Sequence, residues 1–130
     1  MQIPQILIVE DDLALAEAVE LKLRHAGFLP IVASSAEIAM RHLAEHIPDL
    51  IWLDVLLPGM SGIDLLEHLR ANQKFKDIPV LIVSVSTSPE KMKRAFELNI
   101  IDFISKSDND IKTVVGRVGE YFAQNAQKQG

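Results

Sequence analysis

Three acids, a hydroxyl and a lysine form the most reactive pattern in the chain, because each lies at the end of a short apolar run. Glu10 and Asp11 follow ILIV, Asp54 follows LIWL, Ser84 follows PVLIV and Lys106 follows DFIS. Apolar runs of this length are typical of buried strands. Carboxylates brought together would repel one another, and a hard divalent cation would remove that repulsion. The pattern therefore indicates a Mg²⁺ site beside a hydroxyl and a lysine.

Asp54 is the candidate for the reacting group of this site. Mg²⁺ commonly binds one or two carboxylates together with a phosphate. The cation and a nearby ammonium group would neutralise charge on the oxygens of a phosphoryl group, and a carboxylate held beside them can attack phosphorus. Pro58, Gly59 and Gly62 in DVLLPGMSG would hold the loop after Asp54 in a fixed shape. The predicted chemistry is phosphoryl transfer to Asp54.

Each of these residues also has an ordinary structural explanation when it is taken alone. Asp11 or Asp12 is suited to capping a helix, and Asp54 is suited to starting a turn. Ser84 fits a strand-end hydroxyl bonded to backbone, and Lys106 fits an exposed surface. It is their joint placement at the ends of separate strands that favours a functional site.

The elements that must position these residues are five strands alternating with five helices. The apolar runs are ILIV, LPIVA, LIWL, PVLIV and DFIS, and amphipathic segments lie between them. Continuously apolar strands are expected in a parallel sheet that is covered on both faces. Pro30 favours an edge position for the second run, because proline cannot donate to a central ladder. The sequence predicts a (βα)5 α/β fold with right-handed crossovers and its site at the carboxyl ends of the strands.

Local signals mark the ends and the buried faces of the helices. Gly27 is expected to end the first helix. Ser34 and Glu37 have the spacing of a capping box that opens the second helix. Ser88 and the proline after it open the fourth. The apolar residues expected on buried faces are Met92, Ala95 and Phe96 in the fourth helix, and Ile111, Val114, Val115, Val118 and Phe122 in the fifth.

Composition limits the class of protein. The chain has 130 residues, a net charge of −5 and no cysteine. We expect one soluble domain over residues 1–123, followed by a polar tail or the start of a linker over residues 124–130. Without thiols or a signal-peptide pattern, a reducing cytoplasm is the expected compartment. No run is long enough to span a membrane, and no basic surface favours direct nucleic-acid binding.

With these residues in place, the chain resembles a response-regulator receiver domain of two-component signalling, of the kind found in chemotaxis regulators. The matching segments are ILIVEDD, DVLLPGMSG, IPVLIVS and FISK, in the family's order and spacing. The resemblance runs from Ile6 to the last helix. It implies a flavodoxin-like, doubly wound sheet with strand order 2-1-3-4-5. It also implies a signalling phosphoacceptor rather than an enzyme, with only self-catalysed phosphoryl transfer and autodephosphorylation.

The resemblance further implies a role for each acidic residue. Asp54 corresponds to the phosphoacceptor, which receives its phosphoryl group from a sensor histidine kinase or a phosphotransfer protein. Asp11 corresponds to a direct Mg²⁺ ligand and Glu10 to a ligand acting through water. The backbone carbonyl of Leu56 would supply a third protein ligand.

Three further positions correspond to the family's signalling residues. Ser84 matches the hydroxyl residue that hydrogen-bonds the phosphoryl group after transfer, and Lys106 matches the lysine that pairs with it. Phe103 matches the switch aromatic. We therefore expect a downstream target, or a second copy of the chain, to contact the fourth helix, fifth strand and fifth helix, around Lys91, Ala95 and Phe103.

The sequence departs from the family at three positions. Ser107 stands where proline in a cis peptide is usual, and we expect a trans bond because a cis bond without proline costs about 2.5–4 kcal/mol. Val85 stands where a smaller residue is usual and could narrow access to the acceptor. Asn99 replaces a helix-ending glycine, and asparagine tolerates the left-handed conformation.

Three other functions are consistent with parts of the sequence. A non-phosphorylated pseudo-receiver that only binds other proteins keeps some support from Ser107 and Val85. A phosphatase with an aspartate nucleophile usually carries a second acid two residues later, where this chain has Leu56. The segment His42-Leu43-Ala44-Glu45-His46 matches the H-x-x-E-H zinc motif, but Pro48 ends that helix at once, so we expect no zinc site there.

Overall fold

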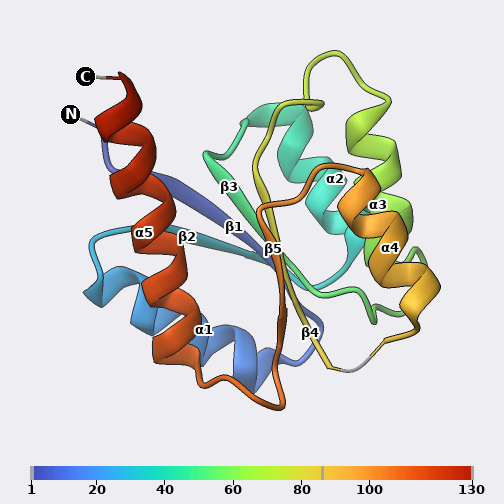
Figure 1. The fold of residues 1–130 in the computed structure, drawn as a ribbon, viewed down its shortest axis with the longest axis horizontal. Helices are drawn as coiled ribbons and strands as arrows, with labels where there is room; N and C mark the ends of the chain where they lie inside the picture. Colours follow the sequence, from blue (N-terminus) through green and yellow to red (C-terminus); the bar gives the residue numbers. More distant parts are fainter. Residues whose placement is uncertain (1, 86, 130) are drawn as a thin grey trace.

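Five strands form one parallel sheet in the order β2-β1-β3-β4-β5 (Figure 1). The structure, a computed structural model, describes residues 2–85 and 87–129. The strands are β1 (Gln5–Val9), β2 (Leu29–Ala33), β3 (Leu50–Leu53), β4 (Val80–Ser84) and β5 (Asp102–Ser105). The helices are α1 (Leu13–His25), α2 (Ala36–Glu45), α3 (Gly62–Arg70), α4 (Pro89–Glu97) and α5 (Ile111–Gln129). The predicted fold class and strand order are confirmed.

The two faces of the sheet bury separate apolar cores. Helices α1 and α5 cover one face, and α2, α3 and α4 cover the other (Figure 1). Alternate residues of each strand point to opposite sides, so Ile51 and Leu53 of β3 join the core under α2 and α3, while Leu50 and Trp52 join the core under α1 and α5. Because both faces are covered, β3 is apolar at every position, and β1 and β4 are apolar except for one residue at an end, Gln5 and Ser84.

β2 lies at an edge of the sheet, as Pro30 predicted, with this proline opposite Ile6 of β1. The other edge is β5, whose residues are only partly buried. Crossovers from β1 run outward to β2 and then back past β1 to β3, so the direction of winding reverses beside β1 and β3. In open α/β sheets, that reversal is where a ligand site forms at the carboxyl ends of the strands.

The helix ends agree with the sequence at α1 and α4 and differ at α2. Gly27 lies just beyond α1 with a φ of 94°, and Ser88 caps α4 ahead of proline. The capping box expected between Ser34 and Glu37 is wrong: Ser35 is the N-cap and accepts from the backbone N–H of Ile38 at 3.1 Å. Both serines can cap a helix, so the local pattern left the register open by one residue.

The burial expected for α4 is only partly correct. Ala95 is fully buried, but Met92 and Phe96 are 39% and 49% exposed. The helix lies at the edge of its layer, over β5 and beside α3 (Figure 1), so only a narrow stripe reaches the core. Ala95 therefore cannot form part of a partner-contacting surface, and Met92 and Phe96 are the apolar groups that α4 exposes.

Helix α5 extends further than expected. Val114, Val115 and Val118 are buried against the sheet, and Ile111 and Phe122 pack against the same core. The helix continues to Gln129, so most of residues 124–130, expected to be a tail or linker, prolong α5. Among residues 2–85 and 87–129, no helix combines the length and apolarity needed to cross a bilayer.

Candidate functional site

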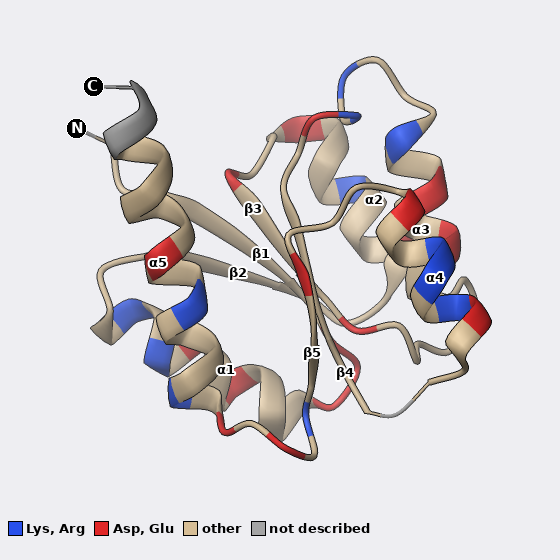
Figure 2. Ribbon diagram, in the orientation of Figure 1, with Lys and Arg blue, Asp and Glu red and all other residues tan. Residues whose placement is uncertain are grey.

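The predicted site residues meet at the carboxyl ends of the strands. The acids that follow β1 and β3 and the lysine that follows β5 gather where the strands end, as the red and blue positions in Figure 2 show. Asp54, Glu10 and Ser84 are 4%, 1% and 0% exposed. Polar side chains buried to this degree need partners, and each of them has one.

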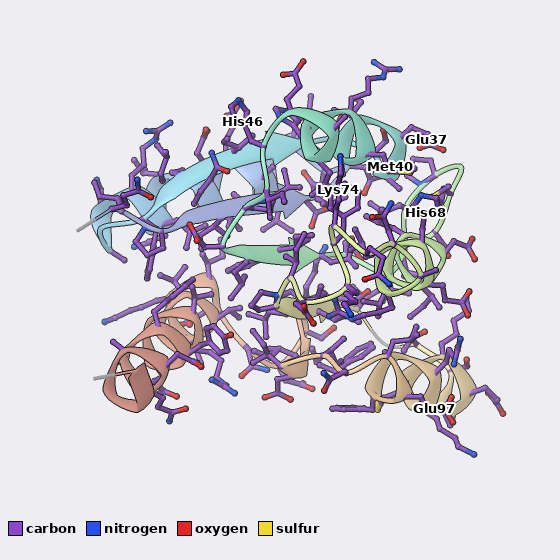
Figure 3. The ribbon with its side chains drawn as sticks, turned by 90° about the horizontal axis from the view of Figure 1, so that it is seen from above. Glu37, Met40, His46, His68, Lys74 and Glu97 are labelled. Atoms are coloured by element: carbon purple, nitrogen blue, oxygen red, sulfur yellow. The ribbon has the colours of Figure 1, made fainter. Side chains whose placement is uncertain are left out.

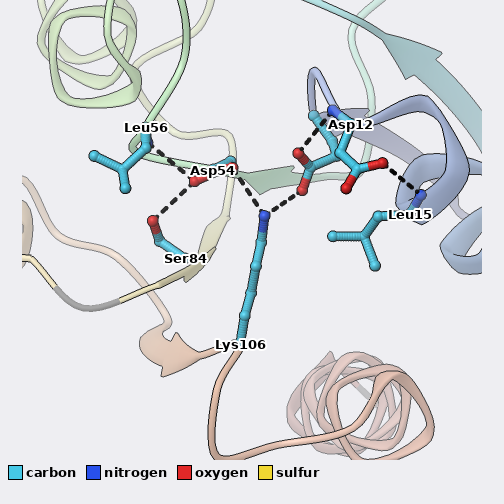
Figure 4. A network of polar contacts seen from close by, with 7 residues as sticks. Asp12, Leu15, Asp54, Leu56, Ser84 and Lys106 are labelled. Carbon is cyan, nitrogen blue, oxygen red and sulfur yellow. Dashed lines mark hydrogen bonds and ion pairs between the residues drawn. The ribbon is translucent and has the colours of Figure 1, made fainter.

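Asp54 lies at the centre of the polar network in Figure 4. Its Oδ1 accepts a hydrogen bond from the hydroxyl of Ser84 at 2.8 Å and from the backbone N–H of Leu56 at 3.0 Å. Its Oδ2 accepts from Nζ of Lys106 at 2.9 Å. Donors from β4, from the loop after β3 and from the end of β5 thus fix the orientation of a single carboxylate.

Glu10 is the second buried acid of the site. Lys106 Nζ donates to its Oε1 at 2.5 Å, and the backbone N–H of Asp12 donates to its Oε2 at 3.2 Å. Burial raises the pKa of Glu10 above its ordinary value, and the hydrogen bonds from Lys106 and Asp12 only partly oppose that effect. Burial therefore disfavours the charged form of Glu10 despite its contact with Lys106.

Lys106 joins the two acids through a single ammonium group. Burial by itself would lower the pKa of Lys106, but hydrogen bonds to Asp54 and Glu10 outweigh burial, and the pKa is raised. The lysine is therefore held in its charged form.

Asp11 is exposed and completes an acidic cluster. Carboxylate oxygens of Glu10, Asp11 and Asp54 all lie within 4.8 Å of one another. Three negative charges face one positive charge, that of Lys106, so the cluster carries an excess of negative charge. A hard divalent cation with oxygen ligands fits this set of donors and would offset the excess.

The loop between β3 and α3 places Asp54 and Leu56. A Cβ on Gly62 would lie 2.2 Å from the carbonyl oxygen of Asp54 and 2.7 Å from Cα of Val55, so the loop closes on a position that excludes side chains. Gly59 has a φ of 73°, in the left-handed region that favours glycine. The two positions thus require glycine for different reasons: Gly62 leaves no space for a side chain, and Gly59 has a left-handed backbone conformation.

Glu37 is a contributor to this loop that the sequence did not reveal. One carboxylate oxygen accepts from the backbone N–H of Met60 at 3.2 Å, and Figure 3 shows Glu37 at the α3 side of α2. Hydrogen bonds to the backbone, with that of Met60 among them, lower the pKa of Glu37. The capping-box spacing drew attention to Glu37, but it pointed to the wrong partner.

The departures from the family pattern leave the lysine in place. The bond between Lys106 and Ser107 is trans, as expected, since the described residues contain no cis peptide. Lys106 still reaches Asp54 at 2.9 Å. Asn99 adopts the left-handed conformation, with a φ of 63°. Val85 is 40% exposed beside Ser84.

Phe103 is partly buried on β5 and packs against the core under α2, α3 and α4. It pairs with Ile82 of β4, two residues before Ser84. The residue thus lies on the face that carries α4.

Arg70 anchors the C-terminal end of α4, a role that the sequence did not reveal. The guanidinium donates to the carbonyl oxygens of Leu98 at 2.8 Å and Asn99 at 3.3 Å, just beyond α4. It also donates to two carbonyls of the segment before β4, those of Lys76 and Ile78, each at 2.9 Å. Long-range contacts to backbone carbonyls leave no local sequence signal.

His42 and His46 do not form part of the site. They lie in the last turn and at the C-cap of α2, and Figure 3 shows His46 at the end of that helix away from Glu37. Within the described residues, the acidic cluster is the one set of three or more potential metal ligands. Among the described residues, His42 and His46 therefore have no third side chain with which to form a zinc site.

Comparisons with known proteins agree with this geometry. A family model described as the response regulator receiver domain matches residues 6–115. Phosphate regulon transcriptional regulatory protein PhoB of Escherichia coli is 37% identical over 114 residues, which cover 88% of this chain and 49% of that protein. The chain thus spans about half the length of the curated relatives it matches.

Two solved structures are similar over nearly their whole length. A putative response regulator from Chloroflexus aurantiacus is 32% identical, with a TM-score of 0.83 over 94% of this chain and 99% of that one. The signal receiver domain of a signal transduction histidine kinase from Syntrophus aciditrophicus is 30% identical, with a TM-score of 0.82 over 93% and 91% of the two chains.

Proposed function

Because this chain belongs to the response regulator receiver domain family, we propose that it takes a phosphoryl group onto Asp54 from a histidine kinase or a phosphotransfer protein. The observation that supports this most is the environment of Asp54. Its carboxylate is almost fully buried, yet both oxygens are held by donors within 3.0 Å at the edge of the sheet. A structural aspartate in a turn would not need this arrangement.

Four groups of the chain would hold Mg²⁺ beside the acceptor. Asp11 and Asp54 would bind the ion directly with the backbone carbonyl of Leu56, and Glu10 would bind through water. The close approach of the three carboxylates supports this assignment. When bound, Mg²⁺ supplies positive charge that offsets the acids and the phosphoryl oxygens.

The transfer step needs little from the protein besides position and charge. An Oδ oxygen of Asp54 attacks phosphorus, the bond from phosphorus to the donor histidine nitrogen breaks, and the electron pair remains on that nitrogen, which takes up a proton. Lys106 loses one carboxylate partner as Asp54 becomes an acyl phosphate and turns its ammonium group to the phosphoryl oxygens. Ser84, which donates to Asp54 Oδ1 before transfer, donates to a phosphoryl oxygen afterwards.

When Ser84 changes its hydrogen-bond partner, the resulting movement would be transmitted through β4 and β5 to the surface of the protein. As Ser84 moves toward the phosphoryl group, it vacates space that Phe103 can fill. Helix α4 would respond because its buried residue, Ala95, and the backbone contacts of Arg70 both hold its C-terminal end, while its N-terminal turns have no such anchor among the described contacts. The proposed output surface is therefore the exposed part of α4, with Met92 and Phe96, together with β5 and α5.

We propose that the chain signals rather than turns over a substrate. Leu56 stands where an aspartate-based phosphatase would carry its second acid, and its side chain is 45% exposed. Loss of phosphate would then be a slow self-hydrolysis. The pseudo-receiver alternative draws its support from Ser107 and Val85. Ser107 leaves Lys106 in contact with Asp54, and Val85 is 40% exposed.

Output through a further domain is also a proposal. PhoB of Escherichia coli is described as a transcriptional regulatory protein and the Syntrophus aciditrophicus domain as part of a histidine kinase. A receiver of this kind would pass its signal either to an attached module or to a separate target.

Intact-mass measurement tests the proposed function. The protein is incubated with acetyl phosphate, with and without Mg²⁺. The same treatment is given to Asp54→Asn and to the matched variant Asp77→Asn, which changes an exposed aspartate before β4, at the amino ends of the strands. One added phosphoryl group is expected in the wild type and in Asp77→Asn, only with Mg²⁺. No addition to the wild type, or equal addition to Asp54→Asn, would refute the proposal.

A further inference from the structure

A groove of about 670 Å³ lies between α1 and the start of α5. It opens on the face of the sheet opposite α4 and so lies away from the proposed output surface. Its lining is mainly apolar. Val19, Trp52, Val83 and Val114, from α1, β3, β4 and α5, form a floor that is only 1–3% exposed, and Leu15 and Ile111 are the more open apolar walls. This volume is within the range of sites that bind small molecules.

Lysines lie at the mouth of the groove. Lys22 of α1 and Lys112 of α5 both line it and are exposed, and Figure 2 shows lysine and arginine positions on these two helices. Within the described part of the chain, neither lysine forms an ion pair. Two exposed cations thus lie beside an apolar surface.

Asp110 is the one acid at the mouth, and its carboxylate is already engaged. Its Oδ1 accepts from the backbone N–H of Thr113 at 2.8 Å, where it caps α5. Its hydrogen bonds with Thr113, and then the nearby charges of Lys112 and Lys22, lower its pKa. Asp110 therefore offsets only part of the positive charge.

We propose that this groove binds a small apolar anion, an aromatic or aliphatic carboxylate or sulfonate, with its apolar body between Leu15 and Ile111, over Trp52, and its charge beside Lys22 and Lys112. The apolar body gains free energy by leaving water. The anion gains from two exposed cations whose charge Asp110 offsets only in part. A neutral molecule of the same shape gains only the first contribution, so the site discriminates by charge.

The groove reaches the phosphoacceptor site through Lys106. The side chain of Lys106 lines the groove, while its Nζ contacts Glu10 and Asp54. Figure 4 shows Leu15 on one side of this lysine and Ser84 on the other. A bound anion would limit the movement of Lys106 and slow phosphorylation, a consequence that rests on the proposed function.

Trp52 is the chain's one tryptophan, so its fluorescence reports on the groove directly. The probes are anilinonaphthalene sulfonate, which is anionic, and phenylnaphthylamine, its neutral relative. We expect saturable one-to-one binding of the anionic probe with energy transfer from Trp52, and weaker binding of the neutral probe. Phosphate donors are absent, so the result does not depend on whether Asp54 is phosphorylated.

Two sets of variants separate the contributions of charge and shape. The double variant Lys22→Glu/Lys112→Glu should weaken the anionic probe by about tenfold and leave the neutral probe unchanged. The control Lys91→Glu/Lys93→Glu, with the same charge change on α4, should alter neither. Leu15→Phe should weaken both probes by reducing the space. Equal loss of the anionic probe in the two lysine pairs, equal affinity for both probes, or binding unaffected by Leu15→Phe would overturn the proposal.

Discussion

The ammonium nitrogen of Lys106 lies 2.9 Å from Oδ2 of Asp54, across 52 residues of sequence. The two residues follow β5 and β3, which are separated in the sheet by β4. Parallel pairing through β4 is what brings their ends together, and Ser84 at the end of β4 contacts the same carboxylate. The contact thus links the topology of the sheet to the charge balance of the site.

Replacing Lys106 by methionine should destabilise the metal-free fold. Glu10 and Asp54 would remain buried without their shared cation, at a cost of about 3 kcal/mol. Mg²⁺ should restore part of that loss by taking over charge compensation. Urea unfolding with and without Mg²⁺ measures both effects, and equal stability of variant and wild type without metal would contradict the assigned role.

The same variant should change the pH dependence of stability. The pKa of Lys106 is raised above its ordinary value of 10.5 in the folded state. Its protonated form therefore stabilises the fold fully below that pH, and the contribution is lost as pH rises through the folded-state pKa. The stability difference between wild type and Lys106→Met should shrink in this alkaline window. A constant difference across the window would show that Lys106 does not titrate with folding.

Mg²⁺ should stabilise the protein through the acidic cluster. A ligand that binds only the folded state adds about 2.7 kcal/mol at a concentration of one hundred times Kd. Asp11→Ala should remove most of the response, because it deletes an exposed carboxylate of the cluster without disturbing the buried contacts of Asp54. Asp77→Ala is the charge-matched control. If thermal melts of the two variants respond equally to Mg²⁺, the metal site lies elsewhere.

Gly62→Ala should damage both stability and phosphorylation. The new Cβ would overlap the carbonyl oxygen of Asp54, and the resulting shift should cost about 1–3 kcal/mol. Gly116→Ala is the control, because a Cβ there meets nothing within 4 Å and lies in α5. That change should stabilise the protein by about 0.5–1 kcal/mol. Equal effects of the two changes would contradict the steric role of Gly62.

Addition of beryllofluoride and Mg²⁺, as a phosphoryl mimic, should change NMR shifts on the proposed output surface. Shifts are expected at Ser84 and Phe103 and on the exposed side of α4, including Phe96. Phe103→Ala should suppress the α4 shifts while leaving those near Asp54. Changes confined to the loops around Asp54 would show that this chain does not signal through α4.

Much of the fold was predictable because the strands are short, apolar and regularly spaced. Parallel strands place their carboxyl ends at one edge, so residues that follow apolar runs had to converge there. Pro30 also identified an edge strand correctly. These conclusions needed only the backbone geometry of a sheet.

What the sequence did not reveal depends on packing between distant segments. The contact of Glu37 with the Met60 amide and the four carbonyl contacts of Arg70 join separate elements. Helix α4 has an apolar pattern, but the exposure of Met92 and Phe96 follows from its position at the edge of a layer. A periodic pattern indicates which residues share a helix face. Whether that face is buried depends on the elements that pack beside the helix.

Site mapping of the modified protein tests the central claim most directly. An aspartyl phosphate is reduced by borohydride to homoserine, so peptide sequencing by mass spectrometry after treatment with acetyl phosphate and Mg²⁺ identifies the acceptor. The account predicts homoserine at position 54 and at neither Asp11 nor Asp12. Homoserine at one of those two positions, or a stable phosphate on Ser84 with Asp54 unchanged, would contradict it.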